Sequence, residues 1–171
     1  MNSHLEQLQQ ALAAAIAGMS EAELNWHPPE KWCAAEVLEH LYLTYTGTLK
    51  GFERVIQGGK PLATVSTLAQ RCRSLLVLDC GYLPRGRKAP ANTRPRGMPA
   101  ETVRTGIIPK IAELDEIITR CEQRWGSRGK LLDHPILGPL TAGQWRKFHL
   151  IHGLHHVRQI QRLRQERKTP K

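Results

Sequence analysis

The segment TAGQWRKFHLIHGLHHVRQIQRLRQER, residues 141–167, predicts one long helix near the C-terminal end of the chain. Thr141, followed three residues later by Gln144, has the pattern of a capping box, in which each side chain binds the other residue's backbone amide. His152 and His156 lie four residues apart, so on a helix they face the same side, one turn apart. Two imidazoles at this spacing can bind one metal ion, which is why H-x-x-x-H is typical of helical metal sites.

The surroundings of this histidine pair leave two interpretations open. Trp145 and Phe148 lie close to the same helical face, so the pair faces the apolar side of the helix. A buried imidazole pair without a partner is costly, and a bound metal ion would remove that cost. The spacing alone also fits histidines that are packed in a core. His149 is two turns from His156, too far to share a compact site with it.

Metal binding would need a third ligand from another part of the chain. His40 lies at the edge of the apolar stripe of a predicted helix over residues 33–57, which makes it the natural candidate. The alternative is that His40 is an ordinary histidine at the edge of the core.

Apolar residues repeat at helical spacing through almost the whole chain. Ser20 and Glu23 form a second capping pattern over a short turn, and Pro109 is expected to kink its helix or to delay the start of it. The predicted long helices cover residues 3–19, 33–57, 65–78, 99–125 and 141–167. The inward residues of the third are expected to be Leu68, Cys72, Leu75 and Leu76.

The segments between these helices are expected to be loops. Residues 81–99 hold seven glycines or prolines and predict a long irregular connection, and residues 133–140 predict a shorter one. No segment alternates in the way a half-buried strand does. The sequence therefore predicts an all-α fold, a single helical bundle without a sheet, over residues 1–171.

Composition excludes several classes of protein. Hydrophobic residues make up 40% of the 171 residues, too many for a disordered chain, and no apolar run approaches the ~18 residues of a membrane span. Glu6, and no basic residue, precedes the Ala-rich segment 12–18, so a signal peptide is not expected and the protein is predicted to be cytoplasmic. The four cysteines lie far apart, which predicts reduced, mostly buried thiols and not a zinc knuckle or a disulfide framework.

Positive charge is concentrated in two segments. The formal net charge is +10, and residues 82–98 hold five bases and no acid, while residues 143–171 hold eight bases and one acid. Such segments can bind anions or nucleic acid, but they are also typical of a solvated loop and a soluble tail. Aromatic residues are scarce in both, so no stacking platform for nucleic acid is evident, and the basic end 158–171 is not expected to bind it.

Two motifs resemble a known family. WCAAEVLEHL, residues 32–41, is similar to the W-S-x-x-E-x-x-x-H-L element of the DinB/YfiT family. GPLTAGQW, residues 138–145, and HLIHGLHHVRQI, residues 149–160, resemble the closing helix of that family. The resemblance implies a four-helix bundle in which His40, His152 and His156 hold a divalent metal. Zn²⁺ is expected first, with Ni²⁺ or Fe²⁺ as alternatives.

The same resemblance implies roles for three neighbouring residues. Cys33 stands where the family has a capping Ser, which should weaken the helix start by ~0.5–1 kcal/mol. Glu36, one turn before His40, can either orient its imidazole or act as a first-turn acid that the helix dipole favours. His155 points away from the ligand face, so we expect it to pack or to support the ligands from outside.

Family members with known activity include thiol-dependent S-transferases and a thiol-dependent maleylpyruvate isomerase. The resemblance thus implies an enzyme whose metal ion activates a low-molecular-weight thiol, or water, for attack on a small-molecule substrate, with no catalytic residue assigned. The basic segment 82–98 could cover this site and bind carboxylates. The alternatives are a non-catalytic metal-binding or stress-response module and, less in keeping with the sequence, a nucleic-acid-binding protein. A homodimer is also expected.

Overall fold

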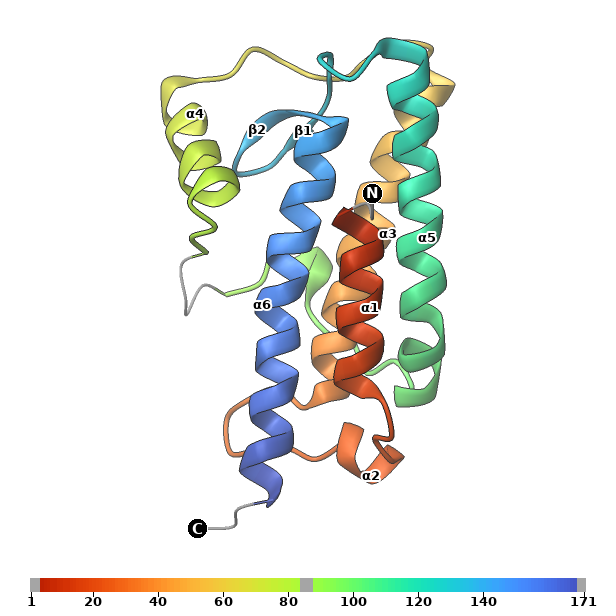
Figure 1. Ribbon diagram of the computed structural model, residues 1–171, viewed down its shortest axis with the longest axis vertical. Coiled ribbons are helices and arrows are strands. Elements are labelled where there is room, and N and C mark those ends of the chain that lie inside the picture. The colour runs from red at the N-terminus through yellow and green to blue at the C-terminus, as the bar shows by residue number, and fades with distance from the viewer. Residues whose placement is uncertain (1–3, 84–87, 169–171) are drawn as a thin grey trace.

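The computed structural model describes residues 4–83 and 88–168. The long helices run side by side (Figure 1), and their buried faces form one core. They are α1 (His4–Ile16), α3 (Ala34–Gln57), α5 (Ala100–Trp125) and α6 (Ala142–Lys168). The shorter elements are α2 (Glu21–Leu24), α4 (Leu68–Ser74), the π-helical η1 (Leu75–Asp79), the 3₁₀-helical η2 (Ala91–Thr93) and the strands β1 (Lys130–His134) and β2 (Gly138–Thr141). The all-α bundle predicted from the sequence is confirmed.

Local sequence signals set where the helices begin. Ser20 and Glu23 exchange hydrogen bonds with each other's amides at the start of α2. The Thr141 amide donates to Gln144 Oε1 (3.1 Å), and the Gln144 amide donates back to the Thr141 hydroxyl (3.2 Å). Both predicted capping boxes are therefore present. Helix α5 already begins at Ala100 and continues through Pro109, so of the two alternatives, a kink or a late start, the late start is wrong.

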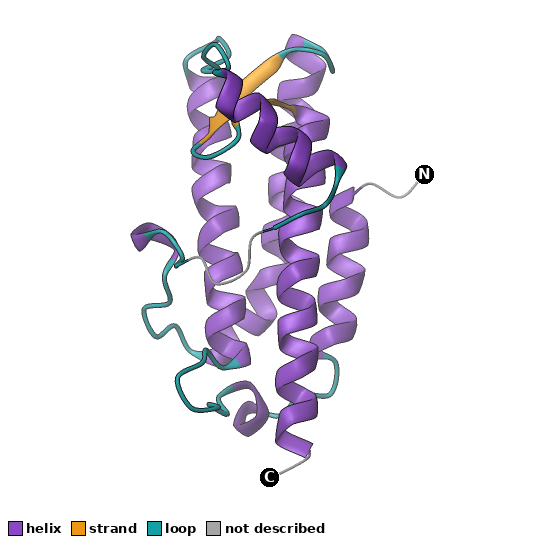
Figure 2. Cartoon of the chain, turned by 90° about the vertical axis from the view of Figure 1, so that its left-hand side faces the viewer, coloured by secondary structure: helices purple, strands orange, loops and turns teal. Residues whose placement is uncertain are grey.

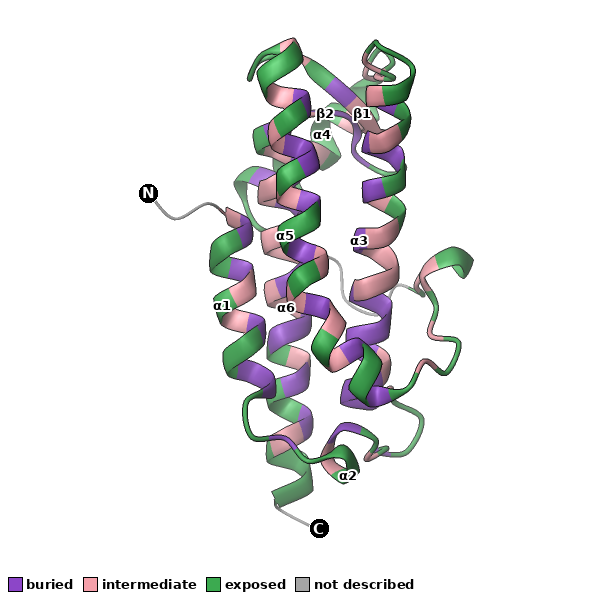
Figure 3. Cartoon of the chain, turned by 90° about the vertical axis from the view of Figure 1, so that its right-hand side faces the viewer, coloured by how far each residue is buried: buried purple, intermediate pink, exposed green. Residues whose placement is uncertain are grey.

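The apolar stripes of the four helices meet in one core, as their inward buried faces show in Figure 3. A half-buried polar contact fixes α6 against α5 beside this core. The Arg146 guanidinium reaches the carboxylates of Asp115 and Glu122, both at 2.6 Å, and donates to the Thr119 hydroxyl at 2.7 Å. Because guanidinium donors are held in a rigid fork, three acceptors on one face of α5 set the rotation of α6 as well as its position.

A β-hairpin replaces the loop predicted over residues 133–140, and it also contradicts the expectation that no sheet is present. Strands β1 and β2 pair antiparallel, with Leu132 opposite Leu140. The hairpin lies at one end of the bundle (Figures 1 and 2). There the Trp145 indole donates to the Leu132 carbonyl at 3.1 Å. Strands of four and five residues are too short to show a clear alternation, so periodicity could not detect them.

The helix predicted over residues 65–78 differs from the observed elements in its length and in the residues that face inward. Helix α4 begins only at Leu68, and the chain then widens into η1, which shifts the inward face away from the α-helical register. Val77 and Leu78 are buried. The four residues expected inside, Leu68, Cys72, Leu75 and Leu76, are exposed.

Helix α4 lies outside the four-helix core because it packs on the hairpin (Figures 1 and 2). The Ser74 hydroxyl donates to the Leu137 carbonyl at 2.9 Å. The cysteines differ accordingly: all are free, Cys33 and Cys121 are buried, and Cys72 and Cys80 are exposed, so the expectation of mostly buried thiols holds for two of the four. None of the helices in the described part of the chain is long and apolar enough to cross a membrane.

Helix α6 packs tightly against its neighbours at Gly153. A Cβ atom placed there would lie 2.2 Å from Leu8 Cδ1 and 3.1 Å from the Tyr45 hydroxyl. Gly47, exposed in the middle of α3, has nothing within 4 Å of such a Cβ. The two glycines thus separate the effect of packing from that of helix propensity.

Gly153→Ala is expected to lower the free energy of unfolding by about 1–3 kcal/mol, because Leu8 and Tyr45 are fully buried and must shift. Gly47→Ala should instead raise it by up to about 1 kcal/mol through helix propensity. Urea denaturation of both variants measures the difference. A Gly153→Ala protein as stable as the Gly47→Ala protein would show that α6 is not held at this distance.

Candidate metal centre

Three histidines from two helices converge inside the bundle. The Nε2 atom of His152 on α6 lies 3.2 Å from Nε2 of His156 and 3.4 Å from Nε2 of His40 on α3. The ligand atoms of all three lie within 4.8 Å of one another. Nitrogen ligands at about 2.05 Å from a tetrahedral Zn²⁺ are about 3.3 Å apart, so the two measured separations suit such an ion. The three histidines chosen from the sequence are thus brought together.

Hydrogen bonds fix the tautomers of two of these imidazoles. Nδ1 of His40 donates to the Thr93 carbonyl at 2.8 Å, and Nδ1 of His156 donates to Gln159 Oε1 at 3.0 Å. Each proton therefore sits on Nδ1, and each Nε2 turns a lone pair toward His152. A carbonyl partner on the far nitrogen is the usual support of a metal-binding histidine. Two lone pairs that converge on a third imidazole leave a natural place for a cation.

Apolar rings enclose the triad. Phe148 stacks on His152 with ring centroids 5.6 Å apart and planes at 8°, and Trp32 lies 5.5 Å from the His40 ring. His40 and His156 are buried, and Nδ1 of the half-buried His152 is inaccessible and has no hydrogen-bond partner among the described residues.

This burial controls the charge of the triad. Desolvation lowers the pKa of His40, and desolvation together with the neighbouring His40 lowers the pKa of His156 to about 3. Desolvation and the neighbouring imidazoles, His156 first among them, hold the pKa of His152 well below its ordinary value. At neutral pH all three rings are therefore uncharged and can serve as ligands without losing a proton.

The chain matches the sequence model of a protein family. The sequence model of the family described as "Protein of unknown function (DUF1569)" matches residues 1–163. The chain belongs to the DUF1569 family. That family is part of the DinB/YfiT-like clan, in agreement with the resemblance seen in the sequence. No curated protein and no solved structure matches the chain.

A loop of the DUF1569 chain supplies one wall of the site. Glu39, almost fully buried beside His40, accepts hydrogen bonds from the amides of Arg96 (2.6 Å), Gly97 (3.1 Å) and Met98 (3.1 Å). Three amide donors satisfy a carboxylate that would otherwise be costly to bury. They hold the same loop whose Thr93 carbonyl orients His40. Glu39 is therefore an anchor that the sequence analysis missed.

The long loop predicted over residues 81–99 is irregular apart from η2 in its described part, and it lies against α3 beside His40. Arg85 and Arg87 lie outside the described residues. Glu36 accepts a hydrogen bond from the Cys33 amide at 2.9 Å, whereas Nδ1 of His40 is paired with Thr93. Of the two roles open for Glu36, the structure therefore supports that of a first-turn acid, which also caps the helix, and not the orientation of His40.

The other histidines of α6 have separate environments. His155 packs edge-on against His156, with ring centroids 5.1 Å apart. His149 is fully buried, stacks on Trp145 at 5.6 Å, and has no partner for either ring nitrogen within the described part of the chain. Desolvation, and then the neighbouring His134, lowers the pKa of His149 to about 3.

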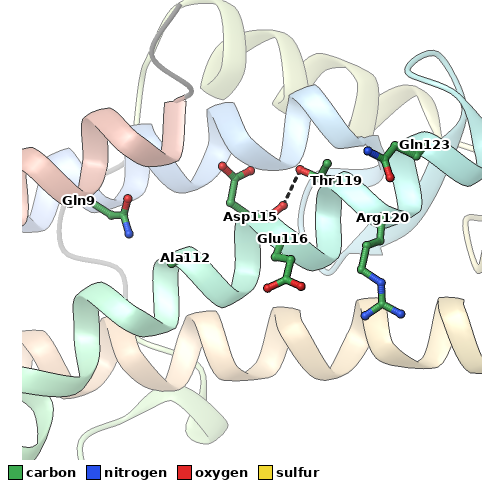
Figure 4. Close-up of a pocket in the computed structure, with 7 residues that line it drawn as sticks. All are labelled: Gln9, Ala112, Asp115, Glu116, Thr119, Arg120 and Gln123. Carbon is green, nitrogen blue, oxygen red and sulfur yellow. Dashed lines mark hydrogen bonds between the residues drawn. The ribbon is translucent and has the colours of Figure 1, made fainter.

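One surface hollow is remote from this chemistry. It has a volume of about 450 Å³ and lies along α1 and α5, where the Thr119 hydroxyl donates to the Asp115 carbonyl at 2.8 Å (Figure 4). Its lining carries both acidic and basic side chains, and none of the three histidines belongs to it. The chemistry of the donor atoms, and not the size of a hollow, identifies the candidate site.

Glu39→Gln is expected to weaken Zn²⁺ binding by about 10–100-fold, since the loop that holds Thr93 against His40 loses its charged acceptor. The same change should lower the unfolding free energy by about 2 kcal/mol. Calorimetric titration with Zn²⁺ measures the affinity, and Glu101→Gln on the surface of α5 is the matched control. Unchanged affinity in a folded Glu39→Gln protein would contradict the anchoring role.

Acid should destabilise the metal-free protein, in part through His149. Its pKa is about 3 when folded and about 6.5 when unfolded, so the unfolded chain binds the extra proton and stability falls as pH drops below about 6.5. His149→Leu should reduce this slope by about 1.4 kcal/mol per pH unit between about pH 6 and pH 4. Denaturation with a chelator present, at several pH values, tests this. Equal slopes would refute it.

Proposed function

We propose that the chain is a metal-dependent enzyme in which His40, His152 and His156 hold a divalent ion. One observation carries the proposal: the Nε2 atoms of His40 and His156 converge on Nε2 of His152, while their Nδ1 atoms donate to fixed oxygen acceptors. Three neutral ligands leave the ion its full charge and an open position, as in catalytic zinc sites. Zn²⁺ is the first expectation, and Ni²⁺ or Fe²⁺ are alternatives.

The proposed reaction is attack of a low-molecular-weight thiol, or of water, on a small electrophilic substrate. The ion would supply Lewis acidity and a lowered pKa for the attacking group. The rings of Phe148 and Trp32 keep water away from the ligands, and the loop held by Glu39 orients His40 through Thr93. Arg94 and Arg96, exposed on that loop, are suited to attract a carboxylate-bearing substrate.

A non-catalytic metal-binding module is the second candidate, and the burial of the triad favours it. His40 and His156 are at most 8% exposed, and none of the three ligands lines the hollow along α1 and α5 or the one beside α4. An ion in such an enclosed place would be held well but reached with difficulty by a substrate. The expected homodimer and the cytoplasmic location stay predictions.

Elemental analysis of protein purified without a metal-affinity tag tests the site. His152→Ala is expected to lose one equivalent of metal per chain, because two imidazoles hold the ion poorly. His155→Ala, on the same helix but outside the triad, should lose none. If His152→Ala and wild-type protein carry equal metal, the triad is not the site.

The reaction needs a separate assay. Metal-loaded protein should consume a thiol such as cysteine or glutathione in the presence of a small electrophile, and His40→Ala should abolish this. The variant with Cys72, Cys80 and Cys121 replaced by Ser should stay active, since none of these thiols is the nucleophile. Turnover without any thiol would assign hydrolysis. A fully loaded protein without turnover across thiols and electrophiles would favour the non-catalytic module.

A further inference from the structure

A second group of ligand atoms lies where α3 begins. His27 from the loop after α2, Cys33 at the N-cap of α3 and Glu36 in its first turn place one donor atom each within 4.8 Å of the others. Nε2 of His27 lies 3.6 Å from Oε2 of Glu36. The set contains nitrogen, sulfur and oxygen, and so differs in chemistry from the three imidazoles.

The loop between α2 and α3 prepares these donors. Nδ1 of His27 donates to the Lys31 carbonyl at 3.3 Å, which leaves a lone pair on Nε2, the atom that faces Glu36. The loop folds back here because the Lys31 amide bonds to the Pro28 carbonyl and Glu30 adopts a positive φ of 56°. The imidazole is therefore held in a tautomer that can bind a metal, by the kind of contact that orients His40.

The remaining two donors supply the negative charge. Glu36 Oε2, the oxygen that lies 3.6 Å from His27 Nε2, also accepts the Cys33 amide at 2.9 Å, and a carboxylate oxygen has a second lone pair for an ion. Cys33 is 2% exposed, which shields its sulfur from other reactants. A thiolate and a carboxylate together balance the charge of a divalent ion, and a thiolate at a helix N-terminus is also stabilised by the helix dipole.

We propose that His27, Cys33 and Glu36 form a second metal site, for Zn²⁺ or another divalent ion that accepts sulfur and nitrogen ligands. The donor set is that of zinc and its chemical neighbours, since Ca²⁺ and Mg²⁺ take oxygen ligands. Burial raises the pKa of the Cys33 thiol, so the ion displaces a proton on binding.

An ion bound at this second site would affect the position of His40 through two contacts. Glu36 and His40 are one turn apart on α3, which places their Cβ atoms about 6 Å apart. Trp32, adjacent to Cys33, contacts the His40 ring. An ion that ties His27 to α3 therefore fixes the loop that carries this tryptophan. The second site would serve as a clamp on one wall of the triad.

Co²⁺ titration of metal-free protein distinguishes the two sites, because only the second contains sulfur. Wild-type protein is expected to bind two equivalents and to develop thiolate-to-cobalt charge-transfer absorption. Cys33→Ser should lose that absorption and one equivalent. This variant is expected to fold, because Ser is a favoured N-cap residue. The control Cys72→Ser/Cys80→Ser, which removes both exposed thiols, should keep the absorption and both equivalents.

Two further variants complete the test. His27→Ala changes an exposed side chain and should also lose one equivalent with the charge-transfer absorption. His152→Ala should keep that absorption while losing the other equivalent, so a failure of the triad is separable from a failure of this site. The proposal is overturned if wild-type protein shows no charge-transfer absorption, or if the absorption survives in Cys33→Ser.

Discussion

The contact between α3 and α6 brings three uncharged imidazoles together in a place that water hardly reaches, and much of the surrounding structure offsets the cost of doing so. His40 and His156 each have an oxygen acceptor for the proton on Nδ1. The Nε2 atoms of His40 and His156 both point at Nε2 of His152. Desolvation lowers the pKa of all three imidazoles, so at neutral pH none of them carries an extra proton that could pair with these lone pairs. A proton on His152 Nε2 can satisfy one of the two lone pairs, whereas a cation between the rings would satisfy both.

The hydrogen-bond acceptor for His40 Nδ1 is the Thr93 carbonyl, on a loop far away in sequence. Glu39 is important because it holds that loop against α3. A carboxylate with three amide donors is well satisfied even when it is buried. One side of α3 thus binds the loop through Glu39, and the next residue receives the loop's Thr93 carbonyl. The loop and the ligand are positioned by neighbouring residues of a single helical turn, so neither can move without the other.

The sequence predicted those features that local spacing determines. The capping pairs Ser20/Glu23 and Thr141/Gln144, the apolar stripes, and the shared face of His152 and His156 all follow from helical periodicity. Features that depend on distant contacts were missed or wrong. The hairpin is too short for its alternation to be recognised, and the π-helical turn of η1 displaced the inward face. Glu39 has an acidic side chain typical of a helix surface, and only the returning loop shows why it is buried.

Polar groups without partners in the described part of the chain lie beside the triad and lower the stability of the metal-free fold. Nδ1 of His152, both ring nitrogens of His149 and the Tyr45 hydroxyl are buried without a hydrogen-bond partner among the described residues. Each such group costs about 1–3 kcal/mol, which the metal-free fold must offset by packing. A ligand that binds only the folded state stabilises that state in proportion to the logarithm of its free concentration. A bound ion would act through the Nε2 atoms of His40, His152 and His156, so it would stabilise the fold at the triad, while the unpartnered atoms of His149 and Tyr45 keep their cost.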